Sequence, residues 1–213
     1  MKQKSEAEVT AILNELAELY PNPETALEYE NTFQLLVAVI LSAQTTDKQV
    51  NKITSELFKK FKKPEDIAEL TPEELEPHIQ GLGLYRNKSK YLVQTCRKLI
   101  KDYDGQVPRE RKELMKLSGV GRKTANVVTS CAFGNDAIAV DTHVFRVSNR
   151  LGLADSDKVK EVEQQLMEVI PRDKWSLAHH WLIFHGRETC KARNPQCENC
   201  ELQENCDYYQ ENF

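Results

Sequence analysis

The sequence has 213 residues, of which 40% are hydrophobic and 29% are charged, with a formal net charge of −4 at pH 7. This composition is typical of a globular protein with one large domain or two smaller ones. The longest apolar run, Leu35 to Leu41, is far too short to span a membrane, and the N-terminus lacks the pattern of a secretion signal. We therefore expect a cytoplasmic protein with reduced thiols and no membrane partner.

The charged residues are unevenly distributed along the chain. The negative net charge is a weak argument against a nucleic-acid partner. Between Leu84 and Cys131, however, twelve lysine and arginine residues face four acidic residues, a formal charge of +8. A local basic surface counts for more than the net charge in phosphate binding. A merely solvated charged face is the alternative.

The first third of the chain shows three helical patterns. Ser5 and Glu8 form a capping box, which predicts the start of a helix. Residues 32–43 are apolar nearly all round, which favours a buried central helix, although a buried strand is the alternative. Thr46 or Asp47 can cap the next helix, whose apolar residues keep helical spacing.

The rest of the chain continues the helical periodicity. Thr71 precedes a proline and two acidic residues, a typical helix start, and residues 85–103 form a basic amphipathic pattern. Further helices are predicted to begin at Thr142 and after the capping residue Asp157, and another covers residues 175–187. Because no alternating strand pattern occurs, we predict an all-α protein of about ten helices.

Two helical patterns flank a Gly-Val-Gly turn within residues 108–133. Gly119 and Gly121 allow backbone angles that a β-carbon forbids, and they let another backbone come close. The amide groups at the start of the second helix form a ready anion site, with Arg122 and Lys123 beside it. This is the helix-hairpin-helix pattern of proteins that hold DNA by its backbone. A plain helical hairpin with a solvated lysine is the alternative.

Four of the six cysteines lie within seventeen residues, with the spacing C-x6-C-x2-C-x5-C: Cys190, Cys197, Cys200 and Cys206. Thiolates at this density in a reducing compartment need a soft metal partner. Zinc sites usually have two close pairs, and only one C-x2-C pair is present, so the spacing favours a [4Fe–4S] cluster. Zinc and disulfides are the alternatives. Lys191 and Arg193 lie in the first loop between these cysteines, where they would make good phosphate contacts.

Three motifs in order along the chain are informative together: residues 117–123, residues 140–143 and the cysteine spacing. This ordered set resembles endonuclease III, a family of iron–sulfur DNA glycosylases with lyase activity. The resemblance covers almost the whole chain and includes residues 41–44 and 83–85. Ser118 is a departure, since the family usually has proline there, and we expect it to have a small effect on stability and none on function.

The resemblance implies two helical domains with double-stranded DNA in the cleft between them. One would be a six-helix barrel over residues 25–135 containing the hairpin. The other would be an iron–sulfur cluster domain formed by residues 1–24 and 136–213. It also implies a [4Fe–4S] cofactor, a monomer, and a cytoplasmic location in association with the nucleoid.

The resemblance further implies site residues. Lys123 would attack the sugar and form a Schiff base, with its neutral amine favoured by the helix terminus and by partial burial. Asp141 would stabilise positive charge on the sugar and move protons, in addition to capping a helix. Gln44 and Leu84 would fill the hole left by an extruded base. The other DNA-binding residues would be Gly119, Gly121, Arg122, Lys191 and Arg193.

The implied function is base excision repair: removal of oxidised pyrimidines, followed by cleavage of the abasic site by β-elimination. One alternative is a monofunctional adenine or mismatch glycosylase of the same superfamily. Such enzymes lack lysine at the position of Lys123, and the adenine enzymes carry a further domain for which a chain ending at Phe213 leaves no room. The other alternative is a non-catalytic DNA-binding module.

Overall fold

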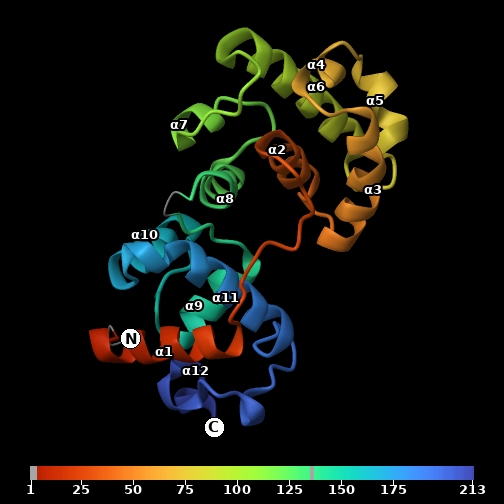
Figure 1. The fold of residues 1–213 in the computed structure, drawn as a ribbon. Helices are drawn as coiled ribbons and strands as arrows, with labels where there is room; N and C mark the ends of the chain where they lie inside the picture. Colours follow the sequence, from red (N-terminus) through yellow and green to blue (C-terminus); the bar gives the residue numbers. More distant parts are fainter. Residues whose placement is uncertain (1–3, 135–136) are drawn as a thin grey trace. The chain divides into compact units, whose positions relative to one another are not determined.

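The computed structural model describes residues 4–134 and 137–213, and every regular element in these ranges is helical, which confirms the predicted all-α class. The chain divides into two compact units (Figure 1). The hairpin unit is Thr25–Gly134, and the cysteine unit joins Met1–Glu24 to Asn135–Phe213. No helix in the described ranges is both long enough and apolar enough to cross a membrane.

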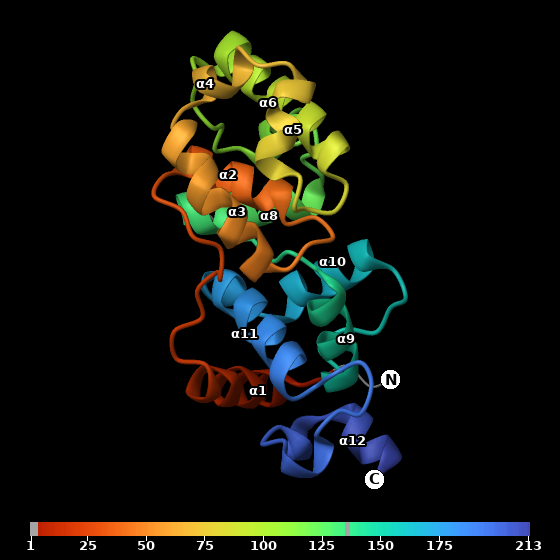
Figure 2. The same cartoon turned by 90° about the vertical axis from the view of Figure 1, so that its right-hand side faces the viewer.

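The hairpin unit is built around helix α2 (Thr32–Leu41). Nine of its ten residues are buried, from Phe33 to Leu41, because the sequence is apolar on every side of the helix. It packs against α3 (Asp47–Lys60), α6 (Tyr85–Tyr103) and α8 (Arg122–Phe133), which surround it in Figures 1 and 2. Residues 32–41 are therefore a helix and not the alternative strand.

Three shorter helices complete the hairpin unit: α4 (Pro64–Ala68), α5 (Pro72–Ile79) and α7 (Arg111–Leu114). Helices α4 and α5 both pack on α6. The predicted start at Thr71 is confirmed, since its side chain accepts a hydrogen bond from the Glu74 amide in a complete capping box. Helix α4 was not predicted, because five residues are too few to establish a helical period.

The cysteine unit consists of α1 (Glu6–Leu19), α9 (Thr142–Leu151), α10 (Val159–Val169), α11 (Trp175–Glu188) and α12 (Asp207–Asn212). Three single-turn 3₁₀ helices lie among them: η1 (Arg172–Lys174), η2 (Cys197–Asn199) and η3 (Gln203–Asn205). Helix α9 packs on α10, α11 and α12, and α11 also packs on α1. The two ends of the chain therefore share one apolar core.

Most predicted helix starts agree with the structure. The Ser5 capping box is present, Thr46 caps α3, and Asp141 caps α9. The predicted cap at Asp157 is wrong, because α10 begins at Val159 with Lys158 at its N-cap and no side-chain cap. The preceding turn is instead closed by Ser156, whose hydroxyl accepts a hydrogen bond from the Lys158 amide at 3.1 Å.

Candidate active site and cysteine centre

The hairpin is formed by α7, a tight turn and α8. The amide of Val120 donates to the carbonyl of Leu117 at 3.2 Å, which closes a four-residue turn. Gly119 occupies the third position with φ +75°, and Ser118 at the second position is not among the residues with positive φ. This combination is a type II turn, in which the third residue must tolerate a positive φ. The sequence places glycine there for that reason.

Helix α6 fixes the position of this turn. The hydroxyl of Thr95 donates to the carbonyl of Ser118 at 2.8 Å. Tyr91 lies directly against Gly119: a β-carbon added to the glycine would lie 2.9 Å from the Tyr91 Cβ. Leu117 and Val120 are buried in the core of the unit. Helix α6 and the core of the unit therefore hold the inner side of the hairpin, and Gly121 on its outer side has no neighbour within 4 Å of an added β-carbon.

The outer surface carries the start of α8. Gly121 is the N-cap, and an added β-carbon there would meet nothing within 4 Å. The amides at a helix N-terminus carry partial positive charge, and a glycine cap lets an anion approach them closely. Arg122 and Lys123 occupy the first two helical positions, and both side chains are exposed. The partial burial expected for Lys123 is therefore wrong: as the second residue of α8, it lies beyond the packed face of the helix, which begins at Ala125.

Asp141 is the N-cap of α9 in the cysteine unit. Its Oδ1 accepts hydrogen bonds from the amides of His143 and Val144, both at 2.8 Å. These two bonds hold the carboxylate at the positive end of a ten-residue helix. Lys123 belongs to the hairpin unit and Asp141 to the cysteine unit.

Gln44 and Leu84 lie in two loops of the hairpin unit. Both have left-handed backbone angles, with φ +53° and +56°, which is uncommon for residues other than glycine. Both side chains are exposed, and Leu84 retains 53% of its accessible surface. Strained residues of this kind cluster at functional sites, and an exposed leucine on such a loop is suited to apolar contact with a ligand.

The four clustered cysteines line one cavity in the cysteine unit. All of them are free thiols. Burial, with a smaller contribution from the neighbouring Cys206 and Cys190, raises the pKa of Cys200 to about 11. Thiols in this condition bind metal only by releasing protons. The donor set is therefore four soft sulfur ligands facing a shared space.

Four thiols around one cavity fit an iron–sulfur cluster, which cysteine thiolates hold in proteins. The presence of only one C-x2-C pair among them is the feature of the sequence that favoured a cluster over zinc.

Two arginines on α9 hold the first loop between the cysteines, and the sequence analysis did not single them out. Arg146 Nε donates to the carbonyl of Cys190 at 3.0 Å. Arg150 Nη1 donates to the carbonyl of Lys191 at 2.8 Å and lies 3.4 Å from the Cys190 Sγ. The loop therefore presents Lys191 and Arg193 as exposed cations. The i, i+4 spacing of the two arginines was the available signal, since it places them on one helix face.

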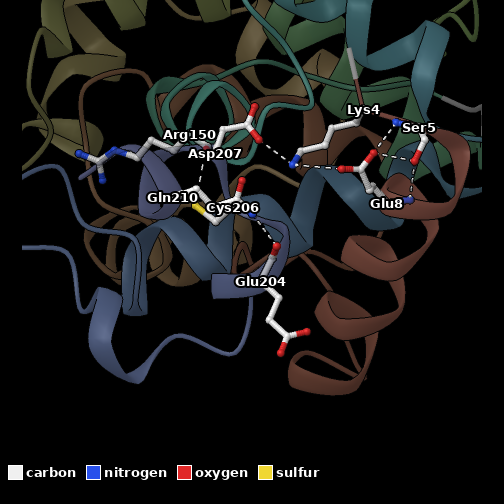
Figure 3. Close-up of polar contacts among 8 residues, drawn as sticks. All are labelled: Lys4, Ser5, Glu8, Arg150, Glu204, Cys206, Asp207 and Gln210. Atoms are coloured by element: carbon white, nitrogen blue, oxygen red, sulfur yellow. Dashed lines mark hydrogen bonds and ion pairs between the residues drawn. The ribbon is translucent and has the colours of Figure 1, made fainter. Parts of the chain in front are cut away.

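Contacts from α9 and from the N-terminal segment hold the segment of the last cysteine, Cys206 and Asp207 (Figure 3). The Cys206 thiol donates to the carbonyl of Arg150 at 3.3 Å, which ties it to α9. The adjacent Asp207 forms an ion pair of 2.6 Å with Lys4, and both side chains are largely buried. The Nζ of Lys4 also lies 3.8 Å from the Oε1 of Glu8 in α1. The N-terminal segment thus supports the segment that carries Cys206.

Comparison with protein families gives two matches. Residues 37–172 match the family of HhH-GPD superfamily base excision DNA repair proteins. Residues 190–206 match the iron–sulfur binding domain of endonuclease III, and this range begins and ends at the first and last clustered cysteines. The first match covers more than half of the chain.

Individual relatives match nearly the whole chain. It is 52% identical to endonuclease III of Bacillus subtilis, over 91% of this chain and 89% of the relative. It is 51% identical to endonuclease III of Rickettsia conorii, over 93% of this chain and 96% of the relative. A trapped covalent complex of an endonuclease III with DNA superposes with a TM-score of 0.93 at 50% identity, covering 98% and 99% of the two chains. The chain therefore belongs to the endonuclease III family of base excision repair enzymes, DNA glycosylases and abasic-site lyases with a [4Fe–4S] cluster.

Proposed function

We propose that this enzyme removes oxidised pyrimidines from double-stranded DNA and cleaves the resulting abasic site, with Lys123 as its nucleophile. One observation carries the assignment: Lys123 is an exposed amine in the first turn of α8, directly after the open glycine cap at Gly121. A phosphate bound at this helix terminus would bring a neighbouring sugar within reach of the lysine. The solved complex of a relative is a trapped covalent intermediate with DNA, which supports a covalent mechanism.

The reaction begins when the neutral Lys123 amine attacks C1′ of the damaged nucleotide. The bond from C1′ to the base breaks, and the base leaves with the electron pair and takes up a proton. The sugar ring then opens to a Schiff base, which acts as an electron sink. Loss of a proton from C2′ breaks the bond from C3′ to its phosphate oxygen and cuts the strand. Water finally releases the lysine.

Asp141 is proposed to assist at C1′. A carboxylate near this atom stabilises the positive charge that develops on the sugar and can accept a proton from the attacking amine. The two amide hydrogen bonds from α9 to Oδ1 fix its orientation. Capping and catalysis are compatible roles for this side chain.

Gln44 and Leu84 are proposed to occupy the space that the extruded base leaves behind. An enzyme that acts on C1′ of a paired nucleotide must take the base out of the stack. The exposed Leu84 would act as an apolar wedge between base pairs, and the Gln44 amide would hydrogen-bond the unpaired partner base. Both side chains are exposed and sit on backbone with positive φ.

The remaining contacts are proposed to hold the DNA backbone. The turn glycines, Arg122 and the α8 amides would bind one phosphate, and Lys191 with Arg193 would bind another. Cys190, Cys197, Cys200 and Cys206 are proposed to hold the [4Fe–4S] cluster, which when bound supplies a rigid frame for the loop of Lys191 and Arg193. We further propose that the enzyme acts as a monomer in the cytoplasm, associated with the nucleoid.

Borohydride trapping tests the central assignment. The substrates are a duplex with one abasic site and a duplex with one thymine glycol. The wild type should form a covalent adduct with both, and Lys123→Ala should form none. Lys116→Ala is the matched control, because Lys116 is an exposed hairpin lysine paired with Glu113, and it should form the adduct as the wild type does.

Other outcomes would overturn the proposal. If the wild type forms no adduct but leaves alkali-labile sites at a damaged base, the enzyme is a monofunctional glycosylase. If neither adduct nor base release occurs while DNA still binds, the chain is a non-catalytic DNA-binding module. An adduct that survives in Lys123→Ala would assign the nucleophile to another residue.

A further inference from the structure

Lys88, in the first turn of α6, is a buried lysine. It retains only 3% of its accessible surface, a rare degree of burial for this residue type. Its ammonium donates a hydrogen bond to the hydroxyl of Thr45 at 2.9 Å. Burial lowers the pKa of Lys88. Burying a cation against a neutral partner has a desolvation cost, which lowers the stability of the fold. A buried lysine at this position is therefore expected to serve a function other than stability.

Lys88 connects the two loops that carry Gln44 and Leu84. Its side chain reaches Thr45, the residue after Gln44. Its backbone amide donates to the carbonyl of Leu84 at 3.0 Å, in the first turn of α6. Lys88 therefore contacts both loops. Its ammonium bonds to Thr45, the neighbour of Gln44, and its backbone amide bonds to Leu84.

Two further contacts hold the loops side by side. A β-carbon added to Gly83 would lie 3.4 Å from the carbonyl of Gln44, so the two backbones are in direct contact. In the first turn of α3, which follows the Gln44 loop, Gln49 Nε2 donates to the carbonyl of Gly81 at 3.1 Å. The two loops are thus linked at three points, and Lys88 provides the charged link.

We propose that Lys88 is a positioning residue that locks the Gln44 loop to the Leu84 loop, so that both side chains enter the duplex together when a base is extruded. The inference rests on the roles proposed above for Gln44 and Leu84. Filling both sides of the vacated space requires the two side chains to keep a fixed separation. A hydrogen bond from a buried cation is strong and directional, and a flexible apolar contact would not fix this separation.

A positioning role and a purely structural role of Lys88 predict different effects of substitution on the unfolding temperature. Replacing the buried ammonium by an apolar group of similar length removes a desolvation cost, so Lys88→Met should unfold at the wild-type temperature or above it. A residue that served only the fold would lower the unfolding temperature when replaced. Thr45→Val removes the same hydrogen bond from the opposite side and leaves the lysine in place.

The experiment follows duplex opening directly. The DNA carries a non-cleavable tetrahydrofuran abasic analogue opposite 2-aminopurine, whose fluorescence rises as it unstacks. Stopped-flow mixing with saturating enzyme gives the rate of this rise. We expect Lys88→Met and Thr45→Val each to slow it by about tenfold or more, as expected for the loss of a hydrogen bond to a charged group. The double variant should be no slower than either single variant.

Two controls isolate the mechanism. Lys90→Met removes the same charge from an exposed position on the same helix and should keep the wild-type rate. Thr45→Ser retains the hydroxyl and should also keep it. If Lys88→Met and Lys90→Met slow the fluorescence rise equally, the loss of one positive charge would explain the effect, and the proposal would be overturned. A wild-type rate in Thr45→Val would overturn it even if Lys88→Met failed to fold. If the wild type forms a borohydride adduct but these variants open DNA normally, only the inference about Lys88 fails.

Discussion

The two glycines of the hairpin should respond in opposite ways to the same substitution. Gly119 has φ +75°, and its added β-carbon would lie 2.9 Å from the Tyr91 Cβ and 3.0 Å from two ring carbons. Because the Tyr91 Cβ does not move when the side chain rotates, the contact is relieved only by shifting backbone. A left-handed alanine costs about 1 to 2 kcal/mol, and overpacking costs about 1 to 3 kcal/mol. Gly119→Ala should therefore lower the free energy of unfolding by about 2 to 5 kcal/mol.

Gly121→Ala should leave the fold almost unchanged. Its φ of −86° suits alanine, and the added β-carbon meets nothing within 4 Å. Alanine is a poorer N-cap than glycine, but it also reduces the entropy of the unfolded chain, and each effect is worth about 0.5 to 1 kcal/mol. The two effects nearly cancel. The new methyl group would, however, stand where a DNA phosphate is proposed to approach, so DNA binding should weaken.

Thermal unfolding by circular dichroism and fluorescence anisotropy with an abasic-site duplex measure the two effects separately. Each kcal/mol should shift the unfolding midpoint of a protein of 213 residues by about 2 to 4 °C. We therefore expect a loss of at least about 4 °C for Gly119→Ala and a change of no more than about 2 °C for Gly121→Ala. Wild-type stability in Gly119→Ala would refute the steric argument. Wild-type DNA affinity in Gly121→Ala would refute the close approach of a phosphate.

Three further predictions concern other parts of the molecule. Ser118→Pro should stabilise the protein by about 0.4 to 1 kcal/mol in denaturant titrations, because proline suits the second position of a type II turn; a loss of stability would mean that the Ser118 backbone cannot adopt the proline angle. Asp207→Asn should remove the ion pair with Lys4 and speed the loss of the cluster absorbance near 400 nm under chelator, and an unchanged rate would show that the N-terminal segment does not support the cluster. Burial, and then the charge of Arg187, lower the pKa of His180. Because this folded-state pKa is below the unfolded value, its contribution to stability is complete above about pH 6.5 and is lost as the pH falls. His180→Gln should therefore flatten the decline in melting temperature between pH 7 and pH 5, and a parallel decline would exclude His180 as a cause.

Signals that lie within a few neighbouring residues were readable from the sequence. The capping box at Ser5 and the cap at Thr71 depend on side chains three residues apart, so their presence in the chain already specifies the hydrogen bonds. The buried helix α2 followed from its almost entirely apolar composition. The short helices α4 and α12 were not predicted, since five or six residues cannot establish a helical period.

Contacts between segments that are distant in the chain could not be predicted from the sequence. The sequence suggested that Lys123 would be partly buried, whereas the fold leaves it exposed at the end of a helix. Lys88 looked like one more member of a basic helix, and only the packing of α6 against the 42–46 loop reveals it as buried and bonded to Thr45. Arg150 likewise acquires its contact with Cys190 from a segment forty residues away.

The sequence by itself determined the helical class, the hairpin turn and the spacing of the four clustered cysteines, because each of these depends on residues close together in the chain. The tertiary structure decided that Tyr91 supports Gly119 from a neighbouring helix. It also decided that Lys4 braces the segment of Cys206 and that Lys88 joins two loops from within the core. The physical reason is that a few neighbouring residues are enough to specify local hydrogen bonds. The burial of a side chain and the partner of a buried charge depend instead on which distant segments pack together.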